Sequence, residues 1–354
     1  NSIANGYGKD VDDIILENEL INSENLVVGQ TITILMPEQV YTVQNGDTIA
    51  DITENNNITM MQLLRNNPFL IERDFIYPGE KLVIRYADEK VGEIRTFGYV
   101  YPFVILEDLR KSLPFLTYLT INSYFFTMQG TIIDINDIDI IQLAKEYNTA
   151  PIMTLSSYGI ELNIVHNILT NDESQNNLLN NIINIVRVKG YYGVNIDFSY
   201  ILPGDKQLFV NFISKATSIL NQEGIDVFVS LNISSLEIQS GILNRGYDFK
   251  AIGEIANSVL LVSHDFYAST YCIPRYFISF SKIQSVIEEI IIQIPRDKII
   301  IEMSIIGYVI KFPYTEGESV ANVINNKNAI ELASQVNAFV TYDTINQVSS
   351  YTYV

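Results

Sequence analysis

The spacing pattern of apolar residues differs between the parts of the chain before and after residue 90. Before this point, apolar residues recur at helical spacing in residues 11–16 and 59–64, and alternating segments follow at residues 30–34 and 80–84. Neighbours three and four apart share one face of a helix, whereas alternating residues line one face of a strand. The N-terminal part is therefore predicted to contain small units built from short helices and short strands.

The pattern after the charged linker at residues 87–90 is larger and more regular. The predicted strands are Phe97–Tyr101, Tyr118–Ser123, Pro151–Leu155, Gly193–Phe198, Asp226–Leu231, Ser258–Ser263 and Ile299–Ser304. The predicted helices include Ile138–Tyr147, Leu178–Lys189, Lys206–Glu223 and Ser281–Ile292. Because buried parallel strands are apolar throughout and are joined by helices, we expect an α/β fold, a TIM (β/α)₈-type barrel, with a doubly wound sheet as the alternative.

A repeat with a period of about 50 residues occupies the N-terminal part. Gly29 and Gly79 each precede one of the alternating segments, and Asn18 and Asn67 hold corresponding places after the helical segments. The first copy starts inside its first helix, without an opening strand. We therefore expect the natural polypeptide to begin before residue 1, because a strand without its partner cannot form a sheet.

The second copy is complete and carries a specific motif. A short strand at residues 41–43 leads into a turn and helix cap at residues 46–48, and the closing strand follows Pro78-Gly79. The order strand, helix, helix, strand and the sequence YTVQNGDTIADI resemble a LysM domain. Two LysM modules, βααβ in order, are therefore expected at residues 1–36 and 39–86.

The LysM resemblance implies a shallow groove that binds N-acetylglucosamine-containing glycans such as peptidoglycan and chitin. The positions that match this groove are Gly46, Asp47, Thr48, Ile49, Phe75, Ile76, Tyr77 and Pro78. Backbone groups there would hold the acetamido group, and apolar side chains would cover the sugar face. For Gly46 and Pro78, a purely conformational role in the turns remains an equal alternative.

The segment GYYGVNIDFSY at residues 190–200 resembles the fourth strand of family 18 glycoside hydrolases, whose signature is D-G-x-[DN]-[IL]-D-x-E. With the modules in front, the chain is similar to bacterial spore-cortex-lytic N-acetylglucosaminidases. The resemblance implies a barrel domain over residues 91–354. Because seven parallel strands leave two open edges, we expect an eighth strand beyond Val354, or another element that closes the barrel.

The catalytic positions implied by this resemblance are altered. Family 18 enzymes let the substrate's acetamido group attack the anomeric carbon, while a Glu protonates the leaving oxygen. Asp197 matches the Asp that orients the acetamido group, but Ser199 occupies the position of the acid, His264 that of a Tyr, and Tyr192 that of the first Asp. A serine hydroxyl is not acidic enough for this task, and losing a general acid costs about 10²–10⁴ in rate.

Glu302, on the seventh predicted strand, is a candidate substitute carboxylate at the barrel mouth. The other interpretation is a carboxylate that serves only the structure. His166 and His264 are the two histidines of the chain and lie far apart in sequence, so neither a metal site nor any other cofactor is expected.

Composition narrows the partners. The net charge of −19 opposes binding to phosphate backbones, so nucleic acid is not expected as a partner. No apolar run reaches the roughly 18 residues that a membrane span needs. Cys272 is the single cysteine, so no disulfide forms within the chain.

These observations favour a catalytically inactive family 18-like protein that binds wall or spore glycan through its LysM modules. Such a pseudoenzyme would have a structural or assembly role at the spore surface, in the coat or in the cell wall. The aromatic run Phe266–Ile278 suits a self-assembly interface, or alternatively a plug over the protein's own barrel mouth. The alternative function is an active peptidoglycan N-acetylglucosaminidase or chitinase-like hydrolase, acting by substrate-assisted retaining hydrolysis.

Overall fold

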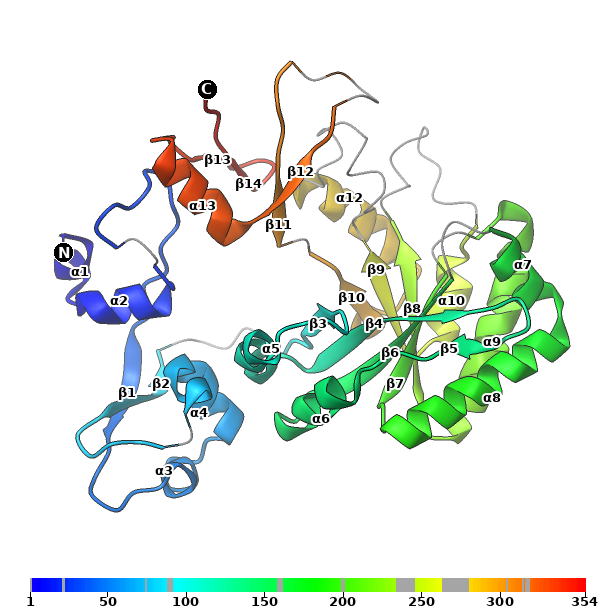
Figure 1. The fold of residues 1–354 in the computed structure, drawn as a ribbon, viewed down its shortest axis with the longest axis horizontal. Helices are drawn as coiled ribbons and strands as arrows, with labels where there is room; N and C mark the ends of the chain where they lie inside the picture. The colour runs from blue at the N-terminus through cyan, green and yellow to red at the C-terminus, as the bar shows by residue number, and fades with distance from the viewer. Residues whose placement is uncertain are drawn as a thin grey trace.

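A curved parallel sheet surrounded by helices forms the larger part of the protein (Figure 1). The computed structural model describes residues 2–20, 23–73, 75–87, 92–157, 162–198, 201–233, 246–262, 280–303, 305–313, 315 and 319–354. Two small helical units and a C-terminal subdomain lie beside the sheet, on the left and at the top of Figure 1.

Seven parallel strands run in the order β10-β9-β8-β7-β6-β4-β3, and the short β5 pairs antiparallel with β4. Their bounds are β3 (Phe97–Val100), β4 (Tyr118–Phe126), β5 (Ile132–Ile133), β6 (Ala150–Ser157), β7 (Gly193–Asp197), β8 (Asp226–Asn232), β9 (Ser258–Val262) and β10 (Ile299–Ile301). All seven predicted strands are confirmed, and with them the (β/α) barrel architecture. The doubly wound alternative is wrong because the sheet curls around an interior of its own.

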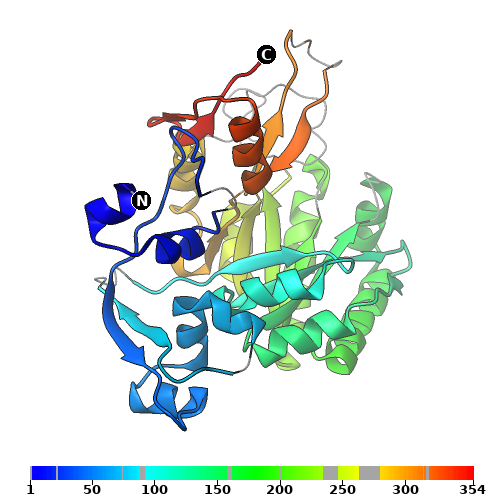
Figure 2. The ribbon, with the colours of Figure 1, turned by 60° about the vertical axis from the view of Figure 1, so that its left-hand side comes forward.

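Helices cover the outer face of this sheet (Figures 1 and 2). They are α5 (Leu106–Ser112), α6 (Ile138–Glu146), α7 (Leu162–Thr170), α8 (Asp172–Lys189), α9 (Lys206–Gln222), α10 (Phe249–Ile255) and α12 (Phe280–Ile290). The helix predicted at Leu178–Lys189 forms the C-terminal part of α8. Asn171 caps the start of α8 through its side chain, and Gly190 ends it at φ +76°, a left-handed conformation that favours glycine.

An apolar layer fills the interior of the sheet at the end where the strands begin. Ile152, Phe228 and Leu260 are buried there, and Phe97, Tyr118 and Ile300 pack against them. These six side chains come from β3, β4, β6, β8, β9 and β10, so both edges of the sheet contact one core. Just below, the Arg95 guanidinium donates a hydrogen bond to the carbonyl of Asp297 and ties the two edges together.

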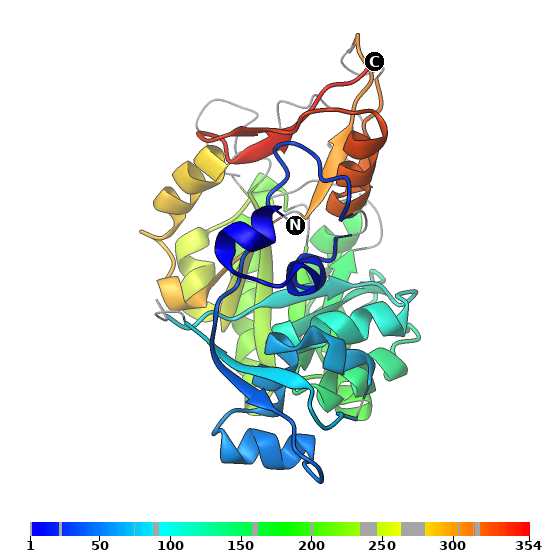
Figure 3. The same ribbon diagram turned by 90° about the vertical axis from the view of Figure 1, so that its left-hand side faces the viewer.

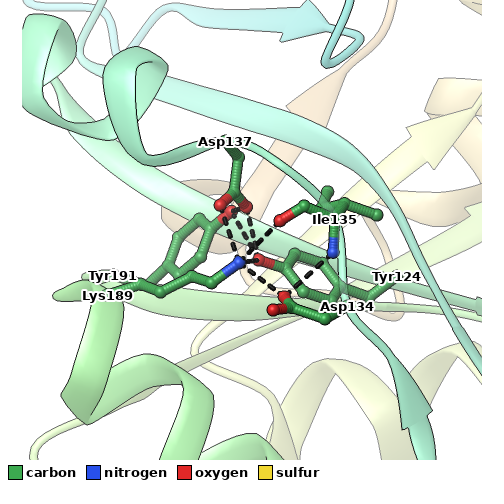
Figure 4. Close-up of polar contacts among 6 residues, drawn as sticks. All are labelled: Tyr124, Asp134, Ile135, Asp137, Lys189 and Tyr191. Atoms are coloured by element: carbon green, nitrogen blue, oxygen red, sulfur yellow. Dashed lines mark hydrogen bonds and ion pairs between the residues drawn. The ribbon is translucent and has the colours of Figure 1, made fainter.

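A buried ion pair fastens α8 to the sheet (Figure 4). Lys189 Nζ lies 2.8 Å from Asp137 Oδ1 and 2.5 Å from Asp134 Oδ1, and Asp137 is inaccessible to solvent. The hydroxyls of Tyr124 and Tyr191 also donate to Asp137. Burial lowers the pKa of Lys189, but the hydrogen bonds to Asp134 and Asp137 outweigh it and raise the pKa above its ordinary value. The lysine is therefore charged at neutral pH and compensates the buried carboxylate.

The second N-terminal unit has the predicted order strand, helix, helix, strand. It consists of β1 (Pro37–Thr42), α3 (Ile49–Asn55), α4 (Met60–Asn66) and β2 (Lys81–Tyr86), and β1 pairs antiparallel with β2. Thr48 and Thr59 each cap a helix with a reciprocal capping box. A core that includes Val43, Ile52 and Leu63 holds the four elements together.

The first unit contains α1 (Ser2–Tyr7) and α2 (Val11–Glu17). The strand predicted at residues 30–34 is not formed, so that prediction was wrong. The reason is physical: among the described strands, none lies beside this segment to accept its ladder hydrogen bonds.

The repeat nevertheless has a common structural anchor. Asn67, after α4, donates to the carbonyls of Leu63 (2.9 Å) and Val83 (2.8 Å) and accepts from the amide of Val83. Asn18, after α2, makes the same three bonds, to the carbonyl of Ile14 and to both backbone groups of Thr33. One asparagine in each unit thus fixes the returning segment to the end of the second helix.

The C-terminal subdomain comprises β11 (Ile306–Val309), β12 (Asn322–Asn325), α13 (Asn326–Gln335), β13 (Thr341–Asp343) and β14 (Val348–Ser350). Two antiparallel pairs, β11 with β12 and β13 with β14, flank α13. Figure 3 shows α13 beside the first N-terminal unit. Within the described part of the chain, none of the helices has both the length and the apolar character needed to cross a bilayer.

Replacing Lys189 with methionine tests the buried ion pair. We expect K189M to lower the free energy of unfolding by about 3 kcal/mol, because it leaves the buried Asp137 carboxylate without its cation, although two tyrosine hydroxyls remain bonded to it. Chemical denaturation followed by circular dichroism measures this change. The control is K111M, which removes the exposed pair Lys111–Glu72 (2.7 Å) and should leave the midpoint unchanged. Equal effects of both variants would contradict the prediction.

Candidate active site and glycan groove

Asp197 ends β7 and lies at the rim of the barrel interior, where the carboxyl ends of the strands meet. Ser156, its register partner on β6, donates a hydrogen bond to Asp197 Oδ2 at 3.4 Å. Ser123 on β4 lies 3.4 Å from Ser156. The structure therefore places the sequence-predicted Asp197 in the barrel mouth, where it accepts a hydrogen bond from the hydroxyl of Ser156 on the neighbouring strand β6.

Glu302 and Tyr99 join Asp197 at the mouth. Glu302 directly follows β10, where its amide donates to the carbonyl of Leu261 at 3.1 Å. Tyr99 on β3 is 39% exposed. Its partial burial and the nearby carboxylates of Glu302 and Asp197 raise its pKa above the ordinary value. The three groups come from strands far apart in the sheet order, so it is the curvature that brings them together.

Sequence reasoning missed Tyr99. Its signal was the alternation in β3, where Phe97 points into the apolar layer and the residue two positions on must point to the same side. The sequence pattern predicts Tyr99 only as part of the strand Phe97–Tyr101, because an aromatic residue in a strand is usually a packing residue.

A polar layer separates the mouth from the apolar base. Ser230 on β8 donates to Asn195 Oδ1 on β7 at 3.0 Å. Thr120, Thr154 and Asn195 are at most 1% exposed, and Thr120 Oγ1, Thr154 Oγ1 and Asn195 Nδ2 have no hydrogen-bond partner within the described residues. Buried polar atoms are normally paired, so this layer is suited to the polar groups of a ligand.

The predicted LysM groove has one wall at the start of α3. Gly46 takes φ +94°, a conformation that a side chain would strain. Asp47 Oδ2 accepts hydrogen bonds from the Tyr41 hydroxyl (2.8 Å) and the Gln44 amide (2.7 Å). Thr48 is the cap of α3, and Ile49 packs on the module core. All four residues thus have structural duties, which keeps the conformational interpretation of Gly46 open.

The opposite wall presents two exposed aromatic rings. Phe75 and Tyr77 are 50% and 57% exposed and meet edge to face, with centroids 5.3 Å apart. The Arg73 guanidinium lies 5.7 Å and 5.5 Å from their ring centroids and is held by an ion pair with Glu80. Ile76 packs against the module core, and Pro78 is exposed. Sequence reasoning found the rings but missed Arg73, which orients them.

Comparison with known proteins identifies both parts. The sequence matches the family model described as glycosyl hydrolases family 18 over residues 99–354, and that of the LysM domain over residues 1–35 and 41–85. The chain belongs to glycoside hydrolase family 18.

Similar proteins share the whole arrangement. The chain is 30% identical to YdhD of Bacillus subtilis (strain 168), provisionally named a sporulation-specific glycosylase, over 99% of this chain and 83% of that protein. It is 29% identical to a cortical fragment-lytic enzyme of the same organism, over 100% and 83%. The crystal structure of the spore cortex-lytic enzyme SleL of Bacillus megaterium QM B1551 superimposes with a TM-score of 0.78 at 26% identity, covering 99% of this chain and 82% of that one.

Of the three altered catalytic positions, Ser199, His264 and Tyr192, the structure describes Tyr192 only. Ser199 and His264 lie outside the described residues, as do Cys272 and the aromatic run at residues 266–278. Tyr192 precedes β7, and its hydroxyl donates to Asp226 at 2.9 Å. With about 3.3 Å of rise per residue, it lies on the order of 16 Å from Asp197. The replacement at Tyr192 therefore does not bear on proton transfer at the mouth.

Metal-ligating side chains do not gather in the described ranges, where no group of three His, Cys, Asp or Glu residues forms. His166 on α7 bonds instead to Asp205, 2.9 Å away, before α9.

The separation of Tyr192 from the mouth can be measured through its pKa. The hydrogen bond to Asp226, together with burial and the charge of that carboxylate, raises the pKa of Tyr192 to about 12. We expect D226N to lower this pKa toward the ordinary value of about 10, because the neutral phenol loses its charged acceptor and the phenolate loses a repelling charge. An alkaline NMR titration with ¹³C-labelled tyrosine measures it. D197N should leave the Tyr192 titration unchanged; an equal shift would place Tyr192 in the mouth.

Proposed function

We propose that this family 18 protein binds N-acetylglucosamine-containing wall or spore glycan through its LysM modules and does not hydrolyse it. One observation carries the proposal: two residues after Asp197, where the family signature has the acid Glu, stands Ser199. A hydroxyl with this chemistry cannot protonate a glycosidic oxygen at neutral pH, while Asp197 alone supplies only orientation and charge stabilisation.

The second module supports the binding part of the proposal. The pair Phe75 and Tyr77 offers exposed apolar ring surface at one of the two segments that match the LysM groove. Aromatic rings beside backbone polar groups fit a sugar, which has apolar C–H faces and polar edges. The two rings are exposed and lie side by side, so together they form a small apolar surface on which a sugar ring can stack.

A spore-surface, coat or cell-wall location with a structural role follows as part of the proposal. It rests on the names of the relatives, which include cortex-lytic and cortical fragment-lytic enzymes.

Hydrolysis remains the second candidate function, and a specific observation favours it. Glu302 directly follows β10 and Asp197 ends β7, so both carboxylates lie at the carboxyl ends of their strands, and the charge of each acts on the phenol of Tyr99. A carboxylate in this position is a substitute for the missing acid if a glycosidic oxygen lies within hydrogen-bond reach of it.

Turnover assays separate the two functions. We expect the protein to release no reducing ends from muropeptides or chitooligosaccharides above the buffer rate. Assays with D197N and E302Q run in parallel. Turnover by the wild type that is abolished in both variants would replace the first proposal with hydrolysis through Glu302. Turnover that only D197N abolishes would indicate another acid.

Glycan binding is tested by removing one ring of the aromatic pair. We expect Y77A to reduce the fraction that sediments with insoluble peptidoglycan or chitin, with a loss of affinity of at least about fivefold, as for a central apolar contact. The matched control is Y7A, because Tyr7 on α1 is 61% exposed but lies outside the groove. A sedimenting fraction that is unchanged in Y77A, or equally reduced in both variants, would contradict binding through the second module.

A further inference from the structure

The first LysM module makes a contact that the second lacks. Val27 packs with Ala333 and Val340 of the C-terminal subdomain in a small apolar cluster. Two polar bonds reinforce it: the amide of Val340 donates to the carbonyl of Val28 at 2.9 Å, and Asn25 Nδ2 donates to Ser334 Oγ at 3.2 Å. Figures 2 and 3 show this side of the molecule, with α13 against the first module.

The contacting segment is the counterpart of the aromatic wall of the second module. Counting back from Gly29 and Gly79, Val27 corresponds to Tyr77, and Asn25 to Phe75. The two corresponding side chains differ in exposure: Val27 is 8% exposed, whereas Tyr77 is 57% exposed. In the first module, the ring of Tyr77 is thus replaced by a valine side chain buried against the C-terminal subdomain, and that of Phe75 by an exposed asparagine that bonds to Ser334.

The paired glycines distinguish the two modules further. Gly29 and Gly79 take almost the same left-handed conformation, with φ +86° and +88°. A Cβ atom on Gly29 would lie 1.9 Å from the carbonyl oxygen of Val340, whereas a Cβ atom on Gly79 would meet nothing within 4 Å. Glycine at position 29 is therefore required by the turn and by the close approach of residue 340, and glycine at position 79 by the turn only.

The second module is also attached to the barrel domain, but through its other side. Arg65 on α4 donates to the carbonyl of Pro114 at 3.0 Å, and Glu72 pairs with Lys111 at 2.7 Å. This attachment leaves Phe75 and Tyr77 exposed. The tandem is therefore fixed to the barrel domain at two separate points.

We propose that the first LysM module is an internal clamp, in which residues 25–29 are docked on the C-terminal subdomain and are not a glycan receptor. The second module alone presents a glycan-binding wall, and the clamp holds it in a fixed orientation to the barrel. This inference rests on the proposed glycan binding for its receptor part, whereas the docking part stands on the contacts themselves.

The glycine pair supplies the test of docking. G29A and G79A impose the same backbone strain, but only G29A forces residue 340 away. We expect hydrogen exchange of the Val340 amide in the full chain to accelerate at least about tenfold in G29A and to be unchanged in G79A. V27A, which removes apolar contact without strain, should give a smaller acceleration at the same amide. Unchanged exchange in both G29A and V27A would overturn the clamp.

A footprint with soluble chitooligosaccharide tests the receptor part. We expect the bound oligosaccharide to slow amide hydrogen exchange in the segments 46–49 and 75–78. We expect exchange in the segment 25–28 to be unchanged. Protection at residues 25–28 equal to that at 75–78 would overturn the assignment of the first module as a clamp only. Protection at neither segment would count against the proposed glycan binding, and the glycine comparison would still decide the docking.

Discussion

The apolar layer at the base of the barrel is the contact on which the site depends. Ile152, Phe228 and Leu260, with the residues packed on them, belong to strands from one edge of the sheet to the other. Burying these side chains against one another requires the sheet to curl, because a flat sheet would leave them in water. The curl in turn brings the ends of β3, β7 and β10 to a common mouth.

Among the described residues of that mouth, Asp197 accepts a hydrogen bond from Ser156, and Glu302 and Tyr99 contribute a second carboxylate and a phenol. The polar layer beneath them contains buried donors and acceptors that a packing core would avoid.

The two modules illustrate how one repeat diverges in use while its scaffold persists. Asn18 and Asn67 make equivalent hydrogen bonds, and Gly29 and Gly79 share one backbone conformation. The difference lies in what covers the segment before each glycine: protein around Val27, solvent around Tyr77. A module whose wall packs on its own chain adds rigidity at the cost of a free binding surface.

Sequence by itself determined the elements whose signals are local. The seven strands, the longer helices, the second LysM module and the place of Asp197 at a strand end all follow from periodicity, capping residues and a specific motif. The segment at residues 30–34 was predicted as a strand and is not one, because a strand depends on a partner that the pattern does not reveal.

Only the tertiary structure decided which distant residues meet. The meeting of Glu302, Tyr99 and Asp197 at one mouth depends on the curvature of the whole sheet. The docking of Val27 on Val340 joins the two ends of the chain, more than 300 positions apart. Such contacts depend on how helices, strands and loops pack against one another. The pattern of side chains within one element does not predict them.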